Sequence, residues 1–180
     1  DSQKTGEVYK PESLGGELIP YYLYSQEDFF NSKTEKVKTK SSVEYKTPYK
    51  IENGDQIFEP GVTLAEFAKM LKKGHNFSVK EIYAKDNNEE SLNKFRQNLK
   101  DVLSEDKKFI LANFNGKVAG SKTNGHISPL VAYNEDSDSL LVLDVALHKN
   151  QWFWVDLATF YSAMNTKDGD NYRGYLIVKR

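Results

Sequence analysis

Residues 125–134, Gly-His-Ile-Ser-Pro-Leu-Val-Ala-Tyr-Asn, decide the fold together with residues 141–145, Leu-Val-Leu-Asp-Val. A cluster of turn-forming residues at 134–139 separates the two apolar runs, and such a cluster is a common signal for a β-hairpin. The stretch therefore predicts two neighbouring antiparallel strands.

The predicted hairpin brings a histidine and an aspartate to one face of the sheet. With the turn centred near Asp136, Ser128 faces Asp144 across the pair. His126 then lies diagonally from Asp144, about 7–8 Å away along the backbone. A slip of one residue would turn Asp144 to the opposite face, so the prediction depends on the register. An acid that orients an imidazole is two thirds of a nucleophilic triad, although a buried histidine bonded to an acid also occurs without catalysis.

Composition narrows the classes of protein to consider. The 180 residues are enough for one domain with a real core, and the formal net charge of −1 favours neither nucleic acid nor an anionic membrane as a partner. No apolar run approaches the roughly 20 residues that a membrane span needs. The chain contains no cysteine, which excludes disulfides and thiolate metal sites. The sequence does not fix the compartment.

The two parts of the chain differ in pattern. Residues 1–60 are polar and rich in breakers, and we expect an irregular N-terminal region that packs on the core. Within it, residues 33–50 carry many lysines with serine and threonine, which is typical of a solvated connection. Residues 61–180 show clear periodicity and are expected to contain the helices, the sheet and the His/Asp hairpin, so that the whole chain is one structural domain.

Periodicity in the second part predicts two long helices, several strands and a third helix. A capping box at Thr63 and Glu66 begins the first helix, and Gly74 is expected to stop it. The remaining expected elements are a strand at 79–84, a helix at 89–104, and strands at 109–114 and 152–155, then a helix at 156–164 and a strand at 175–178. Helices segregated from an antiparallel sheet indicate an α+β domain.

Several of these residues carry a family resemblance. From about residue 22 to its end, the chain resembles phytochelatin synthase, the glutathione γ-glutamylcysteinyltransferase family, and most of all its smaller bacterial members. The matching residues are Gly125-His126-x-Ser128-Pro129 with Tyr133-Asn134, Leu143-Asp144-Val145-Ala146 with Lys149, Trp154-Val155, Ala163-Met164-Asn165 and Arg173-Gly174, and upstream residues 25–30 and 61–64.

The resemblance implies a papain-like cysteine-peptidase fold and a glutathione chemistry. In such enzymes a cysteine at the start of a buried helix attacks the Cys–Gly bond of glutathione and releases glycine. The γ-glutamylcysteinyl thioester then passes to water or to a second glutathione, and repetition builds metal-chelating peptides. The implied activity is that of a γ-glutamylcysteinyl acyltransferase or cysteine peptidase.

The resemblance also assigns roles to residues of this chain. His126 matches the catalytic base and Asp144 the acid that orients it. Asp168 and Arg173 match positions that hold the amino and carboxylate ends of the γ-glutamyl group, which is itself a zwitterion. The other interpretation of this pair is a surface ion pair of little energetic value. The neighbours of the histidine, Gly125 and Ile127, are assigned to substrate binding.

Two departures from the family pattern matter. Plant members carry arginine where this chain has Leu147, which removes any inference about the activation site of the plant enzymes. The cysteine-bearing helix itself should lie immediately before Asp1 and is missing from this sequence. We expect that the chain is one piece of a longer enzyme and exposes an apolar groove where that helix would pack. The alternative is a homologue without a nucleophile that binds glutathione or peptides, or acts as a scaffold.

A metal-binding module is a third hypothesis, from a different functional class. His75, His126 and His148 lack the spacing of a ligand set, so no metal site and no cofactor are expected. Metal ions would enter only as glutathione thiolate complexes. The expected partners are glutathione and a cysteine-bearing N-terminal segment or chain, with a homodimer left open and neither nucleic acid nor a membrane among them.

Overall fold

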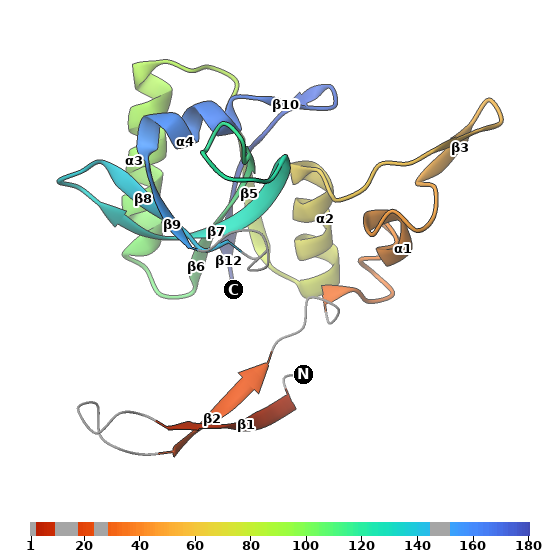
Figure 1. Cartoon of the computed structure of the whole chain (residues 1–180), viewed down its shortest axis with the longest axis horizontal. Coiled ribbons are helices and arrows are strands. Elements are labelled where there is room, and N and C mark those ends of the chain that lie inside the picture. Colours follow the sequence, from red (N-terminus) through yellow and green to blue (C-terminus); the bar gives the residue numbers. More distant parts are fainter. Residues whose placement is uncertain (1–2, 10–17, 24–28, 145–151) are drawn as a thin grey trace.

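The structure is a computed structural model that describes residues 3–9, 18–23, 29–144 and 152–180 (Figure 1). The helices are α1 (Lys40–Val43), α2 (Leu64–His75), α3 (Glu89–Leu103) and α4 (Leu157–Met164). The strands are β1 (Gln3–Tyr9), β2 (Leu18–Leu23), β3 (Lys50–Glu52), β4 (Asp55–Ile57), β5 (Ser78–Tyr83), β6 (Lys108–Asn115), β7 (Gly125–Asn134), β8 (Ser139–Val142), β9 (Phe153–Asp156), β10 (Lys167–Asp168), β11 (Asn171–Tyr172) and β12 (Gly174–Lys179).

One antiparallel sheet organises the molecule. Its strand order is β5-β12-β6-β7-β8-β9, so the last strand in the sequence lies between β5 and β6. Helices α3 and α4 lie on one face of this sheet, and α2 lies on the other, against β5 and β12 (Figure 1). The predicted α+β class with helices on an antiparallel sheet is confirmed.

Each face of the sheet has its own apolar cluster. On the α3 and α4 side, the largest fully buried side chains include Phe95, Phe114, Phe160 and Tyr175. On the α2 side the cluster is smaller and is formed by Leu64, Ala68, Leu71, Leu176 and Val178. Successive residues of β12 contribute alternately to the two clusters, because side chains along a strand point to opposite faces in turn.

Helix α2 begins where the sequence predicts and ends later. Thr63 Oγ1 accepts a hydrogen bond from Glu66 N at 3.2 Å, and Glu66 Oε2 accepts one from Thr63 N at 2.8 Å, which closes the capping box. The predicted stop at Gly74 is wrong, because the helix continues to His75 and ends at Asn76, whose φ is 59°. Gly74 serves close packing instead. A β-carbon there would lie 2.2 Å from Thr34 Cγ2.

Helices α3 and α4 follow their predicted ranges closely. Asn88 caps α3 by accepting a hydrogen bond from Ser91 N at 2.9 Å, and Asp156 caps α4 by accepting one from Thr159 N at 2.8 Å. Both caps satisfy an amide that the first helical turn leaves without a partner. Among the described residues, no helix is long and apolar enough to cross a bilayer.

The β7–β8 hairpin reaches its predicted pairing through a β-bulge. Near the turn, Asn134 pairs with Ser139, which is one residue away from the register that a turn centred at Asp136 would give. The register shifts between Leu130 and Ala132, after which Leu130 pairs with Val142. Continued by two residues, this register sets Asp144 opposite Ser128, as predicted. Without the bulge, Asp144 would point to the other face of the sheet.

The first 60 residues, expected to be irregular, contain short regular elements. The β1–β2 hairpin stands apart from the rest of the chain, and the β3–β4 hairpin projects from it (Figure 1). Residues 33–50 are more than a solvated connection, because Thr34, Lys38 and Ser42 are buried. The buried Lys38 ammonium lies 3.4 Å from Glu66 Oε2, so one lysine of this lysine-rich segment makes a specific contact with α2.

Candidate active site

His126 and Asp144 meet at one end of the central strands. His126 Nε2 lies 2.7 Å from Asp144 Oδ1, which is a short charge-assisted hydrogen bond when the carboxylate is ionised. The Asp144 side chain is fully buried, and the His126 side chain is 14% exposed. The predicted pair is therefore formed, and its acid is shielded while its imidazole keeps access to the outside.

The orientation of the imidazole has a chemical consequence. Because Nε2 is committed to Asp144, Nδ1 is the ring nitrogen left to exchange a proton with another group. Phe114 packs edge-on against the ring, with centroids 5.8 Å apart and planes at 87°. Phe114 is itself fully buried against Phe160. The buried Asp144 and Phe114 side chains therefore contact the His126 ring from two directions.

A second polar group lies on the β10–β11 hairpin and the residue that follows it. Arg173 Nη2 is 3.3 Å from Asp168 Oδ1, and Asn113 Nδ2 donates to Asp168 Oδ2 at 2.9 Å. Arg173 Nη1 also donates to Thr166 Oγ1 at 3.3 Å and to the Lys167 carbonyl oxygen. The Arg173 side chain is 10% exposed and the Asp168 side chain is 30% exposed, so the pair is partly buried.

Glycine at position 125 makes room for this arrangement. A β-carbon there would lie 2.8 Å from Arg173 Nη2. The absence of a side chain lets the guanidinium approach β7 beside His126. Arg173 Nε is buried without a hydrogen-bond partner, which leaves one donor of the guanidinium unused. An unused buried donor costs free energy, and a ligand that accepts from the guanidinium would recover part of it.

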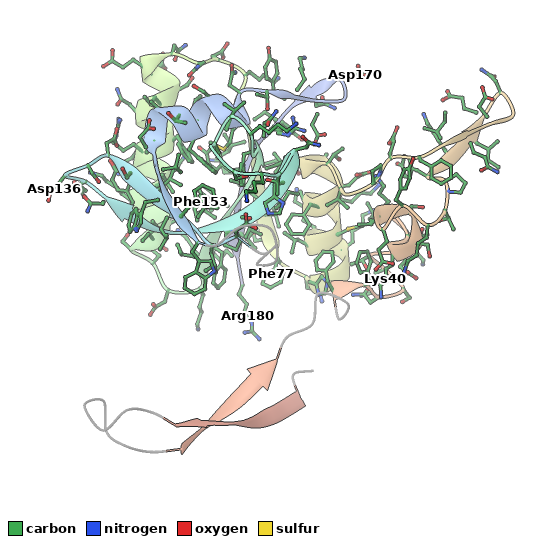
Figure 2. The ribbon with its side chains drawn as sticks, in the orientation of Figure 1. Lys40, Phe77, Asp136, Phe153, Asp170 and Arg180 are labelled. Carbon is green, nitrogen blue, oxygen red and sulfur yellow. The ribbon has the colours of Figure 1, made fainter. Side chains whose placement is uncertain are left out.

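One cavity joins these groups. It has a volume of about 250 Å³, and its lining residues are Pro60, Gly61, Val62, Asn113, Gly125, His126, Ile127 and Asp168. Of the residues singled out from sequence, His126, Asp168, Gly125 and Ile127 line it directly. Asp144 and Arg173 lie behind the lining, bonded to His126 and to Asp168. Asp170, at the tip of the β10–β11 hairpin, points away from the body of the molecule (Figure 2).

Sequence reasoning missed Asn113 and the loop that holds Pro60. Asn113 was assigned to a buried apolar strand, and it is 2% exposed with its amide bonded to Asp168. A lone amide in the apolar run of residues 109–114 was the available signal. The signal for the loop was weaker. It was the dipeptide Pro60-Gly61, whose glycine adopts a φ of 75°, a backbone conformation typical of turns.

An apolar groove runs from the cavity across the α2-facing side of the sheet. It has a volume of about 340 Å³, and its lining residues are Phe29, Phe30, Val43, Val62, Phe67, Leu111, Ile127 and Pro129. Val62 and Ile127 belong to both the groove and the cavity. A further apolar depression of about 320 Å³ shares Leu111 and Pro129 and continues to the exposed Phe109. Among the described residues, the groove and the depression together form a continuous apolar stretch beside the cavity.

The described residues contain no cluster of three or more histidine, cysteine, aspartate or glutamate side chains that could hold a metal ion. His75 packs against Phe29. Its Nε2 lies 2.9 Å from the Phe29 carbonyl oxygen, and its ring stacks on Phe29 with centroids 4.8 Å apart. His148, Leu147 and Lys149 lie outside the described residues.

Comparison with known proteins gives a consistent result. The family model described as phytochelatin synthase matches residues 16–175. A glutathione γ-glutamylcysteinyltransferase of Schizosaccharomyces pombe is 30% identical over 125 residues, which are 68% of this chain and 29% of that protein. Glutathione γ-glutamylcysteinyltransferase 2 of Arabidopsis thaliana is 28% identical over 116 residues, which are 63% of this chain and 25% of that protein. The chain spans less than a third of the length of these relatives.

Proposed function

The chain belongs to the phytochelatin synthase family, and we propose that it supplies the base, the acid and the γ-glutamyl site of an enzyme that cleaves the Cys–Gly bond of glutathione. The observation that carries this proposal is the contact of 2.7 Å between His126 Nε2 and buried Asp144, beside a cavity that Asp168 also lines. The relatives are named glutathione γ-glutamylcysteinyltransferases, which agrees with this chemistry.

His126 acts as the base through Nδ1. A thiol gives its proton to Nδ1, and the thiolate attacks the cysteinyl carbonyl carbon of glutathione. When the C–N bond breaks, the imidazolium returns the proton to the departing amine of glycine, and a γ-glutamylcysteinyl thioester remains. Water or the amine of a second glutathione then attacks the thioester and gives a proton to the imidazole. The C–S bond breaks, and the imidazolium returns the proton to the departing thiolate. Asp144 stabilises the imidazolium and holds the ring in this orientation.

The γ-glutamyl group matches the charges on the other side of the cavity. Its α-ammonium group would bind the Asp168 carboxylate, and its α-carboxylate would bind the Arg173 guanidinium. Asn113 keeps the Asp168 carboxylate in place through the bond of 2.9 Å, and Gly125 leaves room for the guanidinium. A planar, charged donor whose Nε lacks a partner is well suited to a carboxylate.

The thiol has to come from outside these 180 residues, since they contain no cysteine. We assign it to a segment that packs in the groove between Phe67 and Pro129, because this groove shares Val62 and Ile127 with the cavity. An apolar helix lying there would bring its end to His126. A homodimer stays a prediction.

Glycine release from glutathione tests the proposal. The chain alone is expected to release none, and the chain joined to a cysteine-bearing N-terminal segment of a relative is expected to release glycine. His126→Ala should abolish the release, whereas Lys94→Ala, at an exposed position of α3 on the other face of the sheet, should retain it. Arg173→Gln should raise KM by about tenfold or more with a smaller effect on kcat, as loss of a charged hydrogen bond to substrate predicts.

The lack of a cysteine also supports the second candidate, a homologue that binds glutathione without cleaving it. The chain joined to a cysteine-bearing segment distinguishes the two candidate functions. If the segment is shown to be docked and folded, and glutathione binds but no glycine appears, the enzymatic proposal is wrong and the binding role stands.

A further inference from the structure

Ser128 is a buried hydroxyl group without a hydrogen-bond partner. Its residue is completely inaccessible to solvent, and its Oγ makes no hydrogen bond. Leaving such a group unsatisfied costs about 1–3 kcal/mol. Ser128 lies two residues after His126 on β7, so its side chain is on the same face of the sheet as the imidazole. The mechanism described above does not use it.

The residue opposite Ser128 is the acid of the dyad. Beyond the last pair of the β7–β8 ladder, Leu130 with Val142, the Leu143 amide donates to the Pro129 carbonyl oxygen at 3.0 Å, so the same register continued by one more residue places Asp144 opposite Ser128. Directly opposed side chains in a ladder have β-carbons about 4.5–5.5 Å apart. Asp144 is 1% exposed, and its Oδ1 is bonded to His126. A carboxylate has two oxygens with about four lone-pair sites and can accept several hydrogen bonds, and a serine hydroxyl group is a donor.

We propose that Ser128 is a positioning residue whose hydroxyl group donates to the Asp144 carboxylate, after rotation of the Oγ or through one buried water molecule. The bond fixes the plane of the carboxylate, and the carboxylate in turn holds the Nε2–H of His126, so that Nδ1 stays available as the base. The use of Nδ1 rests on the proposed function, whereas the hydrogen bond itself does not. Among the described residues, Asp168 lines the same cavity as His126, and Arg173 lies against Gly125, the neighbour of His126.

The imidazole N–H proton of His126 reports on this bond. In the ¹⁵N-labelled chain only three histidines have to be assigned. Exchange of the Nε2 proton with water is expected to be slow in the wild type and about tenfold faster in Ser128→Ala, the factor that corresponds to one lost hydrogen bond. Ser128→Thr keeps the hydroxyl group on a strand-compatible side chain and should retain slow exchange. Ser42→Ala removes a buried hydroxyl group in α1 and serves as the matched control.

A purely structural serine gives a different pattern. If the hydroxyl group has no role, Ser128→Ala removes an unsatisfied group, so stability stays the same or rises and the exchange rate is unchanged. That result, or fast exchange in a folded Ser128→Thr, would overturn the proposal.

A second measurement tests the Ser128–Asp144 hydrogen bond even if the signal of the His126 Nε2 proton is too broad to follow. Unfolding by urea of Ser128→Ala, Asp144→Ala and the double variant is expected to be non-additive, because each single replacement already breaks the shared bond. Additive effects would overturn the proposal. Neither measurement uses a cysteine, glutathione or turnover, so its failure is distinguishable from failure of the proposed function.

Discussion

Alkaline pH should destabilise the sheet through Tyr175, which lies on β12 behind the candidate site. The Tyr175 side chain is 2% exposed, and its ring packs 4.9 Å from that of Phe95. Its hydroxyl group accepts a hydrogen bond from Asn98 Nδ2 at 2.7 Å. Burial disfavours the phenolate and raises the pKa of Tyr175 from 10.0 to about 12.

The sign and size of the effect follow from this shift. Because the pKa is raised on folding, the contribution of Tyr175 to stability is complete below about pH 10 and is lost as pH rises toward 12 and beyond. A difference of two pKa units corresponds to about 2.7 kcal/mol in the free energy of unfolding. At pH 11 about half of this amount, or about 1.4 kcal/mol, is already lost.

Comparison with Tyr175→Phe isolates this contribution. The variant loses the bond to Asn98, which costs about 1 kcal/mol at pH 8, but it has no phenol to ionise. Urea unfolding of both proteins between pH 8 and pH 11 should therefore show the wild type losing about 1.4 kcal/mol more than the variant. Other tyrosines titrate in both proteins and cancel. A stability difference that is constant over this range would refute the argument that burial of Tyr175 excludes the phenolate.

The remaining predictions concern the core and the hairpin. Leu99→Ala, at a fully buried position of α3, should lower the free energy of unfolding by about 2–5 kcal/mol in urea titrations, and a smaller loss would mean that the site collapses around the cavity. Gly174→Ala should lower the free energy of unfolding by about 3 kcal/mol or prevent folding, because its β-carbon would lie 2.1 Å from the Ile82 carbonyl oxygen. Unfolding followed by circular dichroism measures this, and a variant as stable as the wild type would contradict the prediction. Hydrogen bonding from Arg96 lowers the pKa of Asp138, so its contribution is present above about pH 4 and is lost as pH falls further. Asp138 is 42% exposed, so Asp138→Asn should remove at most about 1 kcal/mol at pH 7, and acid titration of both proteins checks this.

Much of the site could be predicted from local patterns. A hairpin signal singled out His126 and Asp144, and the capping box of α2 is a local feature that the structure confirms. Gly74 shows the limit of such reasoning. A glycine after an apolar periodic run is a common helix stop, but here its role depends on Thr34, forty residues away in the sequence.

Local patterns were enough to predict most of the helices and strands, the α+β class and the candidates His126 and Asp144, because periodicity, caps and turns act over a few residues. Whether these two side chains meet depends on long-range strand pairing. The bulge between Leu130 and Ala132 turns Asp144 to the face of His126, and one residue of register reverses every side chain that follows. The approach of Arg173 to Gly125 likewise depends on the place of β12 beside β6, a pairing between distant segments that no local pattern encodes.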